Sequence, residues 1–203
     1  MLIPLENLVS KYNVQIKGIL HVGAHECEEL LSYEEYISRD KILWIEALED
    51  KVNMSRLSYP GIFIENAVVS DKVETVTFHR SNNSQSSSFL DFGLHEKHHP
   101  DVWYVESFHA ETKLLKNIIC DYDIDFNFLN LDIQGAELKA LKGMENYLTK
   151  VDYIYTEVNS DYVYKNCSLI GEIDDYLSQF GFKRVETVFQ NDYQWGDAFY
   201  IKN

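Results

Sequence analysis

The chain contains few cysteines, and the three that it has lie far apart. Cys27, Cys120 and Cys167 form no close Cys-x-x-Cys pair, and their number is odd. Disulfide frameworks need paired cysteines, and zinc sites are usually built from closely spaced ones, so the sequence indicates neither. Unpaired cysteines fit a reducing compartment, and we therefore expect a cytoplasmic protein.

Basic residues and long apolar runs are also scarce. The chain has 18 Lys and Arg against 33 Asp and Glu, a net charge of -15. Because nonspecific affinity for nucleic acids comes from basic side chains that displace counterions, we expect no nucleic-acid partner. No stretch approaches the roughly 20 apolar residues of a membrane span, and no basic region followed by an apolar run opens the chain. We expect no membrane span and no classical export signal, and nothing indicates the oligomeric state.

The composition is otherwise that of an ordinary globular protein. Hydrophobic residues make up 45% and charged residues 25% of the 203 residues, which suits a single domain over residues 1–203. Short apolar runs alternate with stretches of helical spacing, a pattern typical of βαβ units and a mostly parallel α/β sheet. The runs expected to be strands cover residues 18–23, 42–45, 62–69, 125–133 and 151–158.

Both ends of the chain also show regular patterns. Apolar residues at helical spacing predict a short helix within residues 1–16. A second stripe predicts a helix from an N-cap at Ser168 to Gly181, where a glycine commonly ends a helix. Residues 182–189 and 198–201 are interpreted as a hairpin in which one strand runs antiparallel to the sheet.

Residues 81–104 do not follow this regular pattern. Ser, Asn and Gln are crowded at the start, and His95, His98 and His99 follow. Connections of this length are usually functional lids or insertions, and we expect a long loop here. The three histidines have no zinc-finger spacing, so we interpret them as loop surface.

Ligands of open α/β sheets bind beyond the carboxyl ends of the strands. Gly23 ends the first apolar run, and Glu46 ends the second about 20 residues later, where an acid typically binds ribose hydroxyls. A dinucleotide site needs three glycines around its pyrophosphate, and the window after Gly23 offers no second one. The pattern favours an adenosine-type cofactor over NAD, although a nicotinamide-dependent oxidoreductase and a noncatalytic binding module stay open as alternatives.

The residues at these strand ends resemble those of the FkbM-type methyltransferases. The likeness runs from about Gly18 to the terminal strand near Phe199, and its most specific part is the block Leu131-Asp132-Ile133-Gln134-Gly135-Ala136-Glu137-Leu138. Further parts, in order along the chain, are His21-Val22-Gly23-Ala24-His25, Glu46, Ala67-Val68-Val69-Ser70-Asp71 and Ser86-Ser87-Ser88.

This resemblance implies a fold, a cofactor and an activity. The fold is Rossmann-like, with a mostly parallel seven-stranded sheet, helices on both faces and an antiparallel strand near the C-terminus. The cofactor is S-adenosylmethionine, and the activity is O-methylation of a hydroxyl on a sugar, a glycan or a related small metabolite. The cofactor-binding residues carried over are His21, Gly23, His25, Glu46, Asn66, Ala67, Ser88 and Asp132. The family often has Asp where this chain has His21, and Lys where it has Asn130.

Methyl transfer to a hydroxyl requires an aligned acceptor and a group that takes its proton. Asp132 is our first candidate for that base, with helix capping as the structural alternative. Glu157 ends a later strand and is expected to pair with Asp132, either facing the acceptor or holding a hard cation, although a divalent metal is not expected. His109 is a third candidate, since histidine titrates near neutral pH. Glu137 is interpreted as a first-turn acid that stabilises its helix.

Overall fold

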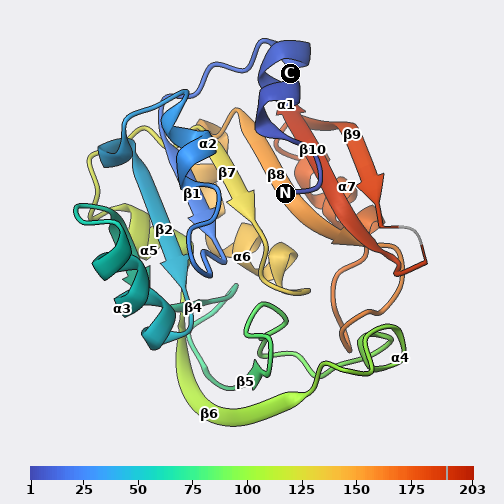
Figure 1. Cartoon of the computed structure of the whole chain (residues 1–203). Coiled ribbons are helices and arrows are strands. Elements are labelled where there is room, and N and C mark those ends of the chain that lie inside the picture. Colours follow the sequence, from blue (N-terminus) through green and yellow to red (C-terminus); the bar gives the residue numbers. More distant parts are fainter. Residues whose placement is uncertain (191) are drawn as a thin grey trace.

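The computed structural model describes residues 1–190 and 192–203, and within them the chain forms a central seven-stranded sheet (Figure 1). The strand order is β3-β2-β1-β7-β8-β10-β9. The first five strands of that order run parallel, whereas β10 runs antiparallel to both of its neighbours. The strands are β1 (Ile19–Val22), β2 (Ile42–Glu46), β3 (Phe63–Asn66), β7 (Phe128–Leu131), β8 (Tyr153–Asn159), β9 (Phe182–Phe189) and β10 (Trp195–Lys202).

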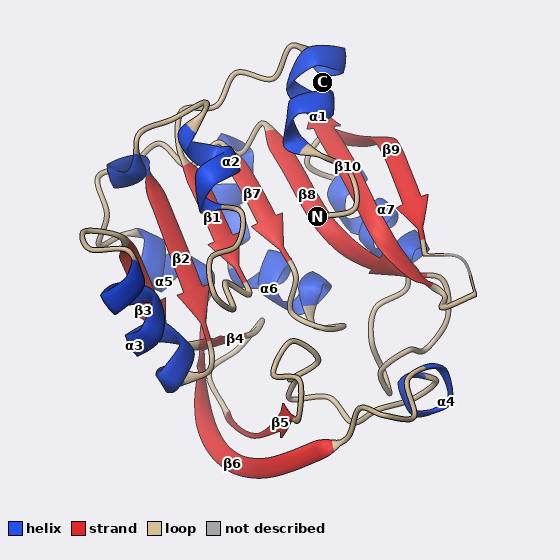
Figure 2. Cartoon of the chain, viewed as in Figure 1, coloured by secondary structure: helices blue, strands red, loops and turns tan. Residues whose placement is uncertain are grey.

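Helices cover both faces of this sheet, as Figure 2 shows. Strand residues alternate between two apolar clusters, one shared with α1, α2 and α3 and the other with α5, α6 and α7. Because both faces are covered, β1 and β2 are buried at every position, as expected of parallel strands. The helices are α1 (Leu5–Tyr12), α2 (Leu30–Glu34), α3 (Glu49–Ser58), α5 (Leu115–Ile119), α6 (Glu137–Gly143) and α7 (Ile170–Ser178), with 3-10 turns at Arg39–Lys41 and Glu145–Lys150.

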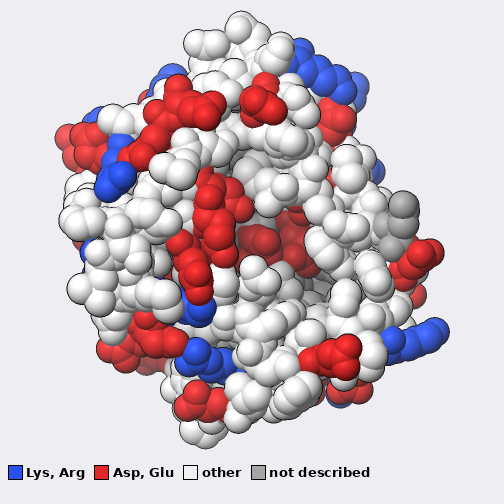
Figure 3. Space-filling model, viewed as in Figure 1, with Lys and Arg blue, Asp and Glu red and all other residues white. Residues whose placement is uncertain are grey.

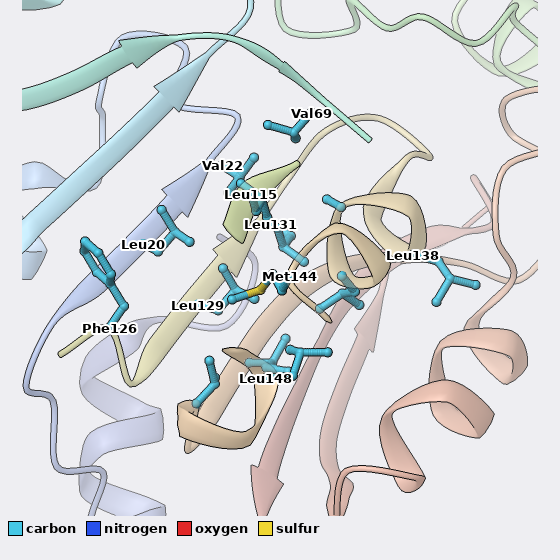
Figure 4. Packing of buried hydrophobic residues seen from close by; sticks show 14 of the residues in the cluster. Leu20, Val22, Val69, Leu115, Phe126, Leu129, Leu131, Leu138, Met144 and Leu148 are labelled. Carbon is cyan, nitrogen blue, oxygen red and sulfur yellow. The ribbon is translucent and has the colours of Figure 1, made fainter. Parts of the chain in front are cut away.

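The larger apolar cluster anchors α6, the helix that begins at the end of the block Leu131–Leu138. Figure 4 shows Leu129 and Leu131 of β7 beside Met144 at the end of α6, and Leu138 of α6 belongs to the same cluster. These side chains expose at most 7% of their surface, and burial of each stabilises the fold by roughly 1.5–3 kcal/mol. The loop between β7 and α6 therefore has firmly packed ends, which positions the residues that it carries.

The Rossmann-like fold with an antiparallel strand near the C-terminus is thus confirmed. The apolar runs located the central strands β1, β2, β7 and β8 because burial on both faces of the sheet favours apolar residues there. The N-terminal helix lies within the expected residues 1–16 and ends where Asn13 adopts a left-handed conformation (φ 52°). The predicted N-cap at Ser168 was wrong by one residue. Leu169 holds that position, and its N–H donates to the Glu172 carboxylate.

A second, three-stranded sheet differs most from the sequence-based expectation. It consists of β4 (Val68–Val69), β5 (Thr75–Ser81) and β6 (Tyr104–Lys113) in the order β4-β6-β5. The expected strand over residues 62–69 was wrong in its second half, because the chain leaves the main sheet after Asn66 and β4 pairs with β6 instead.

The long connection between β5 and β6 contains more order than a free loop. It forms the short helix α4 (His95–His98) and contacts its neighbours through the bridges His79–Ser88 and Phe92–Tyr164. In Figure 1 this connection and the small sheet lie across the carboxyl ends of the parallel strands. In the part of the chain that the structure describes, no helix is long and apolar enough to cross a membrane.

Candidate functional site

A cavity of about 470 Å³ lies beyond the carboxyl ends of β1, β2, β7 and β8. The main sheet forms one side of this cavity, and the connection between β5 and β6, with residues 83–89 and α4, forms the other. Figure 3 shows the hollow with acidic side chains gathered in and around it. The cavity therefore occupies the place where open α/β sheets bind their ligands.

Gly23 forms the tight turn at the end of β1. Its φ of 93° lies in the region that favours glycine, and a Cβ at this position would overlap the carbonyl oxygen of Asp132. The N–H groups of Gly23 and Ala24 both donate to the carbonyl of Ile45, at 2.9 and 3.0 Å. The single glycine thus lets the β1 turn lie directly against the strand ends on both sides.

Glu46, the last residue of β2, points its carboxylate back toward that turn. Oε2 accepts the N–H of His25 and Oε1 accepts the N–H of Leu48, each at 2.8 Å. Burial raises the pKa of Glu46, while these two hydrogen bonds favour its charged form. The carboxylate keeps free lone pairs on both oxygens at the edge of the cavity, and these could accept two hydroxyl groups.

Ala67 and Asn66, which follow β3, take different positions. Ala67 lines the cavity and donates its N–H to the Glu46 carbonyl at 3.0 Å. Asn66 does not line the cavity, because its side-chain amide donates to the backbone carbonyls of Glu46 and Ala47. The structure therefore places Asn66 behind the site, where it supports the Glu46 strand end.

His25 joins the two sides of the cavity. One ring nitrogen contacts Glu28 at 2.6 Å, and the other contacts the hydroxyl of Ser84 at 2.9 Å, 59 residues away in the chain. Burial alone would raise the pKa of Glu28, but the hydrogen bond with His25 and nearby N–H groups lower it to about 2. The β1 turn is thus connected through His25 to the serine-rich segment opposite.

His21 lies in a buried polar network beneath the cavity. Asn130 donates to the hydroxyl of Tyr33 at 2.7 Å, and that hydroxyl lies within hydrogen-bond distance of Nδ1 of His21, 3.0 Å away. The imidazole also stacks on Trp44, and burial lowers its pKa. Burial therefore favours a neutral ring at His21, where the family often has an acid.

Asp132 and Glu157 meet at the opposite end of the cavity. Asp132 is exposed at the end of β7, and Glu157 is buried on β8. The side-chain amide of Gln134 donates to both carboxylates, at 2.6 and 2.8 Å, and its oxygen accepts the hydroxyl of Tyr164 at 2.7 Å. Burial and the neighbouring Asp132 raise the pKa of Glu157 well above its usual range, which favours its protonated form. The expected proximity of Asp132 and Glu157 is observed.

Glu137 lies in the first turn of α6, as the sequence indicates, and it also binds the loop that precedes this helix. Its side chain is fully buried, and Oε1 accepts the N–H groups of Ile133 and Gly135, each at 3.0 Å. Burial raises its pKa to about 7. Glu137 therefore holds the loop that carries Asp132 and Gln134.

The two remaining candidates, Ser88 and His109, differ in whether they line the cavity. Ser88 lines the cavity, but its hydroxyl donates to the carbonyl of Gln134 and so ties the two loops together. His109 is exposed on β6 opposite Thr77 and is not among the residues that line the cavity. The structure therefore gives His109 no access to a ligand there.

Sequence reasoning missed several cavity residues. His95 and His99 were interpreted as loop surface, which was wrong, because α4 turns both rings toward the cavity. Tyr164 and Trp195 also line it, and only their contacts in the fold bring them there. Within residues 1–190 and 192–203, no cluster of three or more His, Cys, Asp or Glu side chains is placed to hold a metal ion.

Several solved structures share this fold. Magnesium protoporphyrin IX methyltransferase of Synechocystis PCC 6803, with bound S-adenosylmethionine, is 10% identical, with 98% of this chain and 76% of that chain covered and a TM-score of 0.52. An S-adenosylmethionine-dependent methyltransferase of Clostridium acetobutylicum ATCC 824 is 6% identical, with coverages of 98% and 89% and a TM-score of 0.54. Ribosomal protein L11 methylase of Lactobacillus delbrueckii subsp. bulgaricus is 10% identical, with coverages of 96% and 75% and a TM-score of 0.51. At such identities the likeness is one of fold.

Sequence comparison gives the family directly. The model of the FkbM methyltransferase domain matches residues 21–184, a span that begins within β1 and includes Glu46, Asp132 and Glu157. A comparison with curated proteins gives no match. The family match favours a methyltransferase over the nicotinamide-dependent oxidoreductase that the βαβ pattern alone left open. With its matching fold and strand-end residues, the chain belongs to the FkbM methyltransferase family.

Proposed function

We propose that this protein is an S-adenosylmethionine-dependent O-methyltransferase that acts on a hydroxyl of a sugar, a glycan or a related small metabolite. The observation that carries the proposal is the position of Asp132. Its exposed carboxylate lines the same cavity as the Gly23 turn and the Glu46 carboxylate. A cofactor site and a proton acceptor therefore share one enclosed space.

The residues present fit S-adenosylmethionine. The Gly23 turn lies at the cavity, where only a residue without a Cβ can pack against the Asp132 carbonyl, and Glu46 offers two carboxylate oxygens for the ribose hydroxyls. The apolar side chains of Ala67, Val68 and Phe78 line the same end and suit an adenine ring. When bound, this cofactor supplies an electrophilic methyl group on a positively charged sulfur, which the acidic lining tolerates better than a diphosphate.

Asp132 is proposed as the base. A hydroxyl is a weak acid, so its oxygen becomes a good nucleophile only if a neighbouring group takes the proton as the new bond forms. Burial favours the protonated form of Glu157, and the Gln134 amide donates to both carboxyl groups. Asp132 is thus the carboxylate that accepts the hydroxyl proton, while Gln134 and Glu157 orient it.

The test is Asp132→Asn, which keeps the shape of the side chain and removes its basicity. Loss of a general base lowers kcat by roughly 10²–10⁴-fold, whereas the dissociation constant of S-adenosylmethionine should change less than about threefold, because Asp132 is placed at the acceptor. Asp123→Asn is the matched control, since Asp123 is exposed outside the cavity. Unchanged turnover in Asp132→Asn, measured as S-adenosylhomocysteine formed, would show that Asp132 is not the base.

A further inference from the structure

The end of the cavity beyond Asp132 has an aromatic wall. Tyr164, Trp195 and His99 line it together with Val102 and Val163. Trp195 begins β10, is half-buried, and packs against a separate apolar cluster formed by Phe92, Val163, Tyr164 and Cys167. The wall is therefore braced from behind, and Trp195 presents its remaining surface as a rigid apolar face.

The side chains that bring charge to the lining are acidic. Glu28, Glu29, Glu46 and Asp132 line the cavity, and no Lys or Arg does so among the residues that the structure describes. The amino group of Met1 also lies at the cavity, where it is paired with Glu29 at 3.4 Å. Figure 3 shows the acidic atoms around the hollow. An anionic ligand group would face carboxylates here with no basic side chain to pair with.

His95 adds a neutral polar group to the same wall. It lines the cavity, exposes 5% of its surface and stacks on Phe92 with ring centroids 4.1 Å apart. Its Nδ1 has no hydrogen-bond partner within residues 1–190 and 192–203. Burial lowers the pKa of His95 to about 4, so the ring is neutral at pH 7. A neutral imidazole offers one donor and one acceptor, which suits an uncharged hydroxyl better than an anion.

We infer that this end of the cavity is the acceptor subsite and that it takes an uncharged sugar ring. The apolar face of the ring lies on Trp195, and its reacting hydroxyl reaches Asp132. Sugars that carry a phosphate or a carboxylate on the same ring are rejected. This inference rests on the proposed function, and it adds the charge class of the acceptor and the residue that selects it.

The first experiment compares methyl transfer by the wild-type protein to three matched panels of acceptors. Panels of methyl hexopyranosides, of their phosphate monoesters and of the corresponding methyl uronosides are incubated with S-adenosylmethionine, and S-adenosylhomocysteine formation is measured. The uncharged panel should contain an acceptor whose kcat/KM exceeds that of its anionic counterparts by at least tenfold, as expected when an anion meets unpaired carboxylates. Equal or better transfer to an anionic sugar overturns the inference and leaves the proposed O-methylation standing. Absence of transfer to all three panels overturns the inference of a sugar acceptor, whereas the proposed O-methylation, which includes related small metabolites, is tested by Asp132→Asn.

The second experiment tests Trp195 directly. Trp195→Ala should raise the KM of the uncharged acceptor roughly five- to tenfold, the range expected for loss of one aromatic contact, with kcat and cofactor affinity within about twofold because Trp195 touches neither reacting group. Trp195→Phe should restore most of the loss. Trp103→Ala is the control, since Trp103 is exposed and does not line the cavity. An unchanged acceptor KM in Trp195→Ala, or a KM that Trp195→Phe does not restore, would remove Trp195 from the subsite.

Discussion

Glu137→Gln should make the protein more stable at neutral and alkaline pH. Glu137 is fully buried, with Oε1 accepting two backbone N–H groups and Oε2 unpartnered within the described residues. A glutamine keeps the oxygen that both N–H groups need, and it has the size of the protonated acid. The substitution therefore removes the charge while preserving the hydrogen bonds that hold the Asp132 loop.

The magnitude follows from the change in pKa on folding. Burial raises the pKa of Glu137 from 4.5 to about 7. A carboxyl whose pKa is raised in the folded state contributes stability that is fully present below its unfolded pKa and is lost as the pH rises through its folded pKa. Each tenfold change in the dissociation constant corresponds to about 1.4 kcal/mol, so the full loss between pH 4.5 and pH 7 approaches about 3 kcal/mol.

Urea unfolding followed by tryptophan fluorescence at pH 5, 6, 7 and 8 measures this effect. Wild type and Glu137→Gln should differ by less than about 1 kcal/mol at pH 5, and the variant should be about 2–3 kcal/mol more stable at pH 8. Glu6→Gln, on the exposed side of α1, is the control and should change neither value. If Glu137→Gln follows the same pH dependence as wild type, the buried carboxyl does not titrate with folding and the argument fails.

Two further predictions concern the loops around the cavity. Gly23→Ala should abolish cofactor binding and destabilise the fold by more than about 3 kcal/mol, because its Cβ would overlap the Asp132 carbonyl. Gly61→Ala is the control, since Gly61 also has a positive φ but its Cβ would meet nothing within 4 Å. A similar loss of stability for both variants in thermal unfolding would refute the overlap at Gly23. Tyr164→Phe removes the hydroxyl that donates to Gln134 at 2.7 Å. Steady-state kinetics should show kcat/KM reduced roughly five- to tenfold, equivalent to about 1–1.4 kcal/mol, with cofactor affinity unchanged. Wild-type kinetics in this variant would mean that Gln134 keeps its position without this hydrogen bond.

Strands buried on both faces were predictable from the sequence, whereas the small sheet was not. The runs that became β1, β2, β7 and β8 are mostly apolar because helices cover both of their faces. β6, by contrast, is mostly exposed along its length, so its residues show no run that single-sequence reasoning detects. The chain's departure from the main sheet after Asn66 depends on pairing with β6, more than 40 residues later.

Some residues of the site were likewise predictable from the sequence, and others were not. Gly23, Glu46 and Asp132 were predictable because they stand where apolar runs stop, and the end of a parallel strand has a known place in the fold. Trp195 and His95 were not, since each reaches the cavity only through contacts with other segments. Asn66 also stands at a strand end, yet its amide bonds to two carbonyls instead of facing the cavity. A position at a strand end thus predicts that a residue lies near the cavity, whereas its local hydrogen bonds determine whether the side chain points into it.

The central claim is that the Gly23 turn and the Glu46 carboxylate bind an adenosine-type cofactor. Isothermal titration calorimetry with S-adenosylmethionine and S-adenosylhomocysteine tests it most directly, with wild type beside Glu46→Gln, which loses one of the two charge-assisted acceptors. Both ligands should bind wild type at a single site, and the variant should bind them about 10- to 100-fold more weakly, as expected for a loss of about 1.5–3 kcal/mol. Absence of heat from either ligand at about 1 mM, or equal affinities in the two proteins, would contradict the claim.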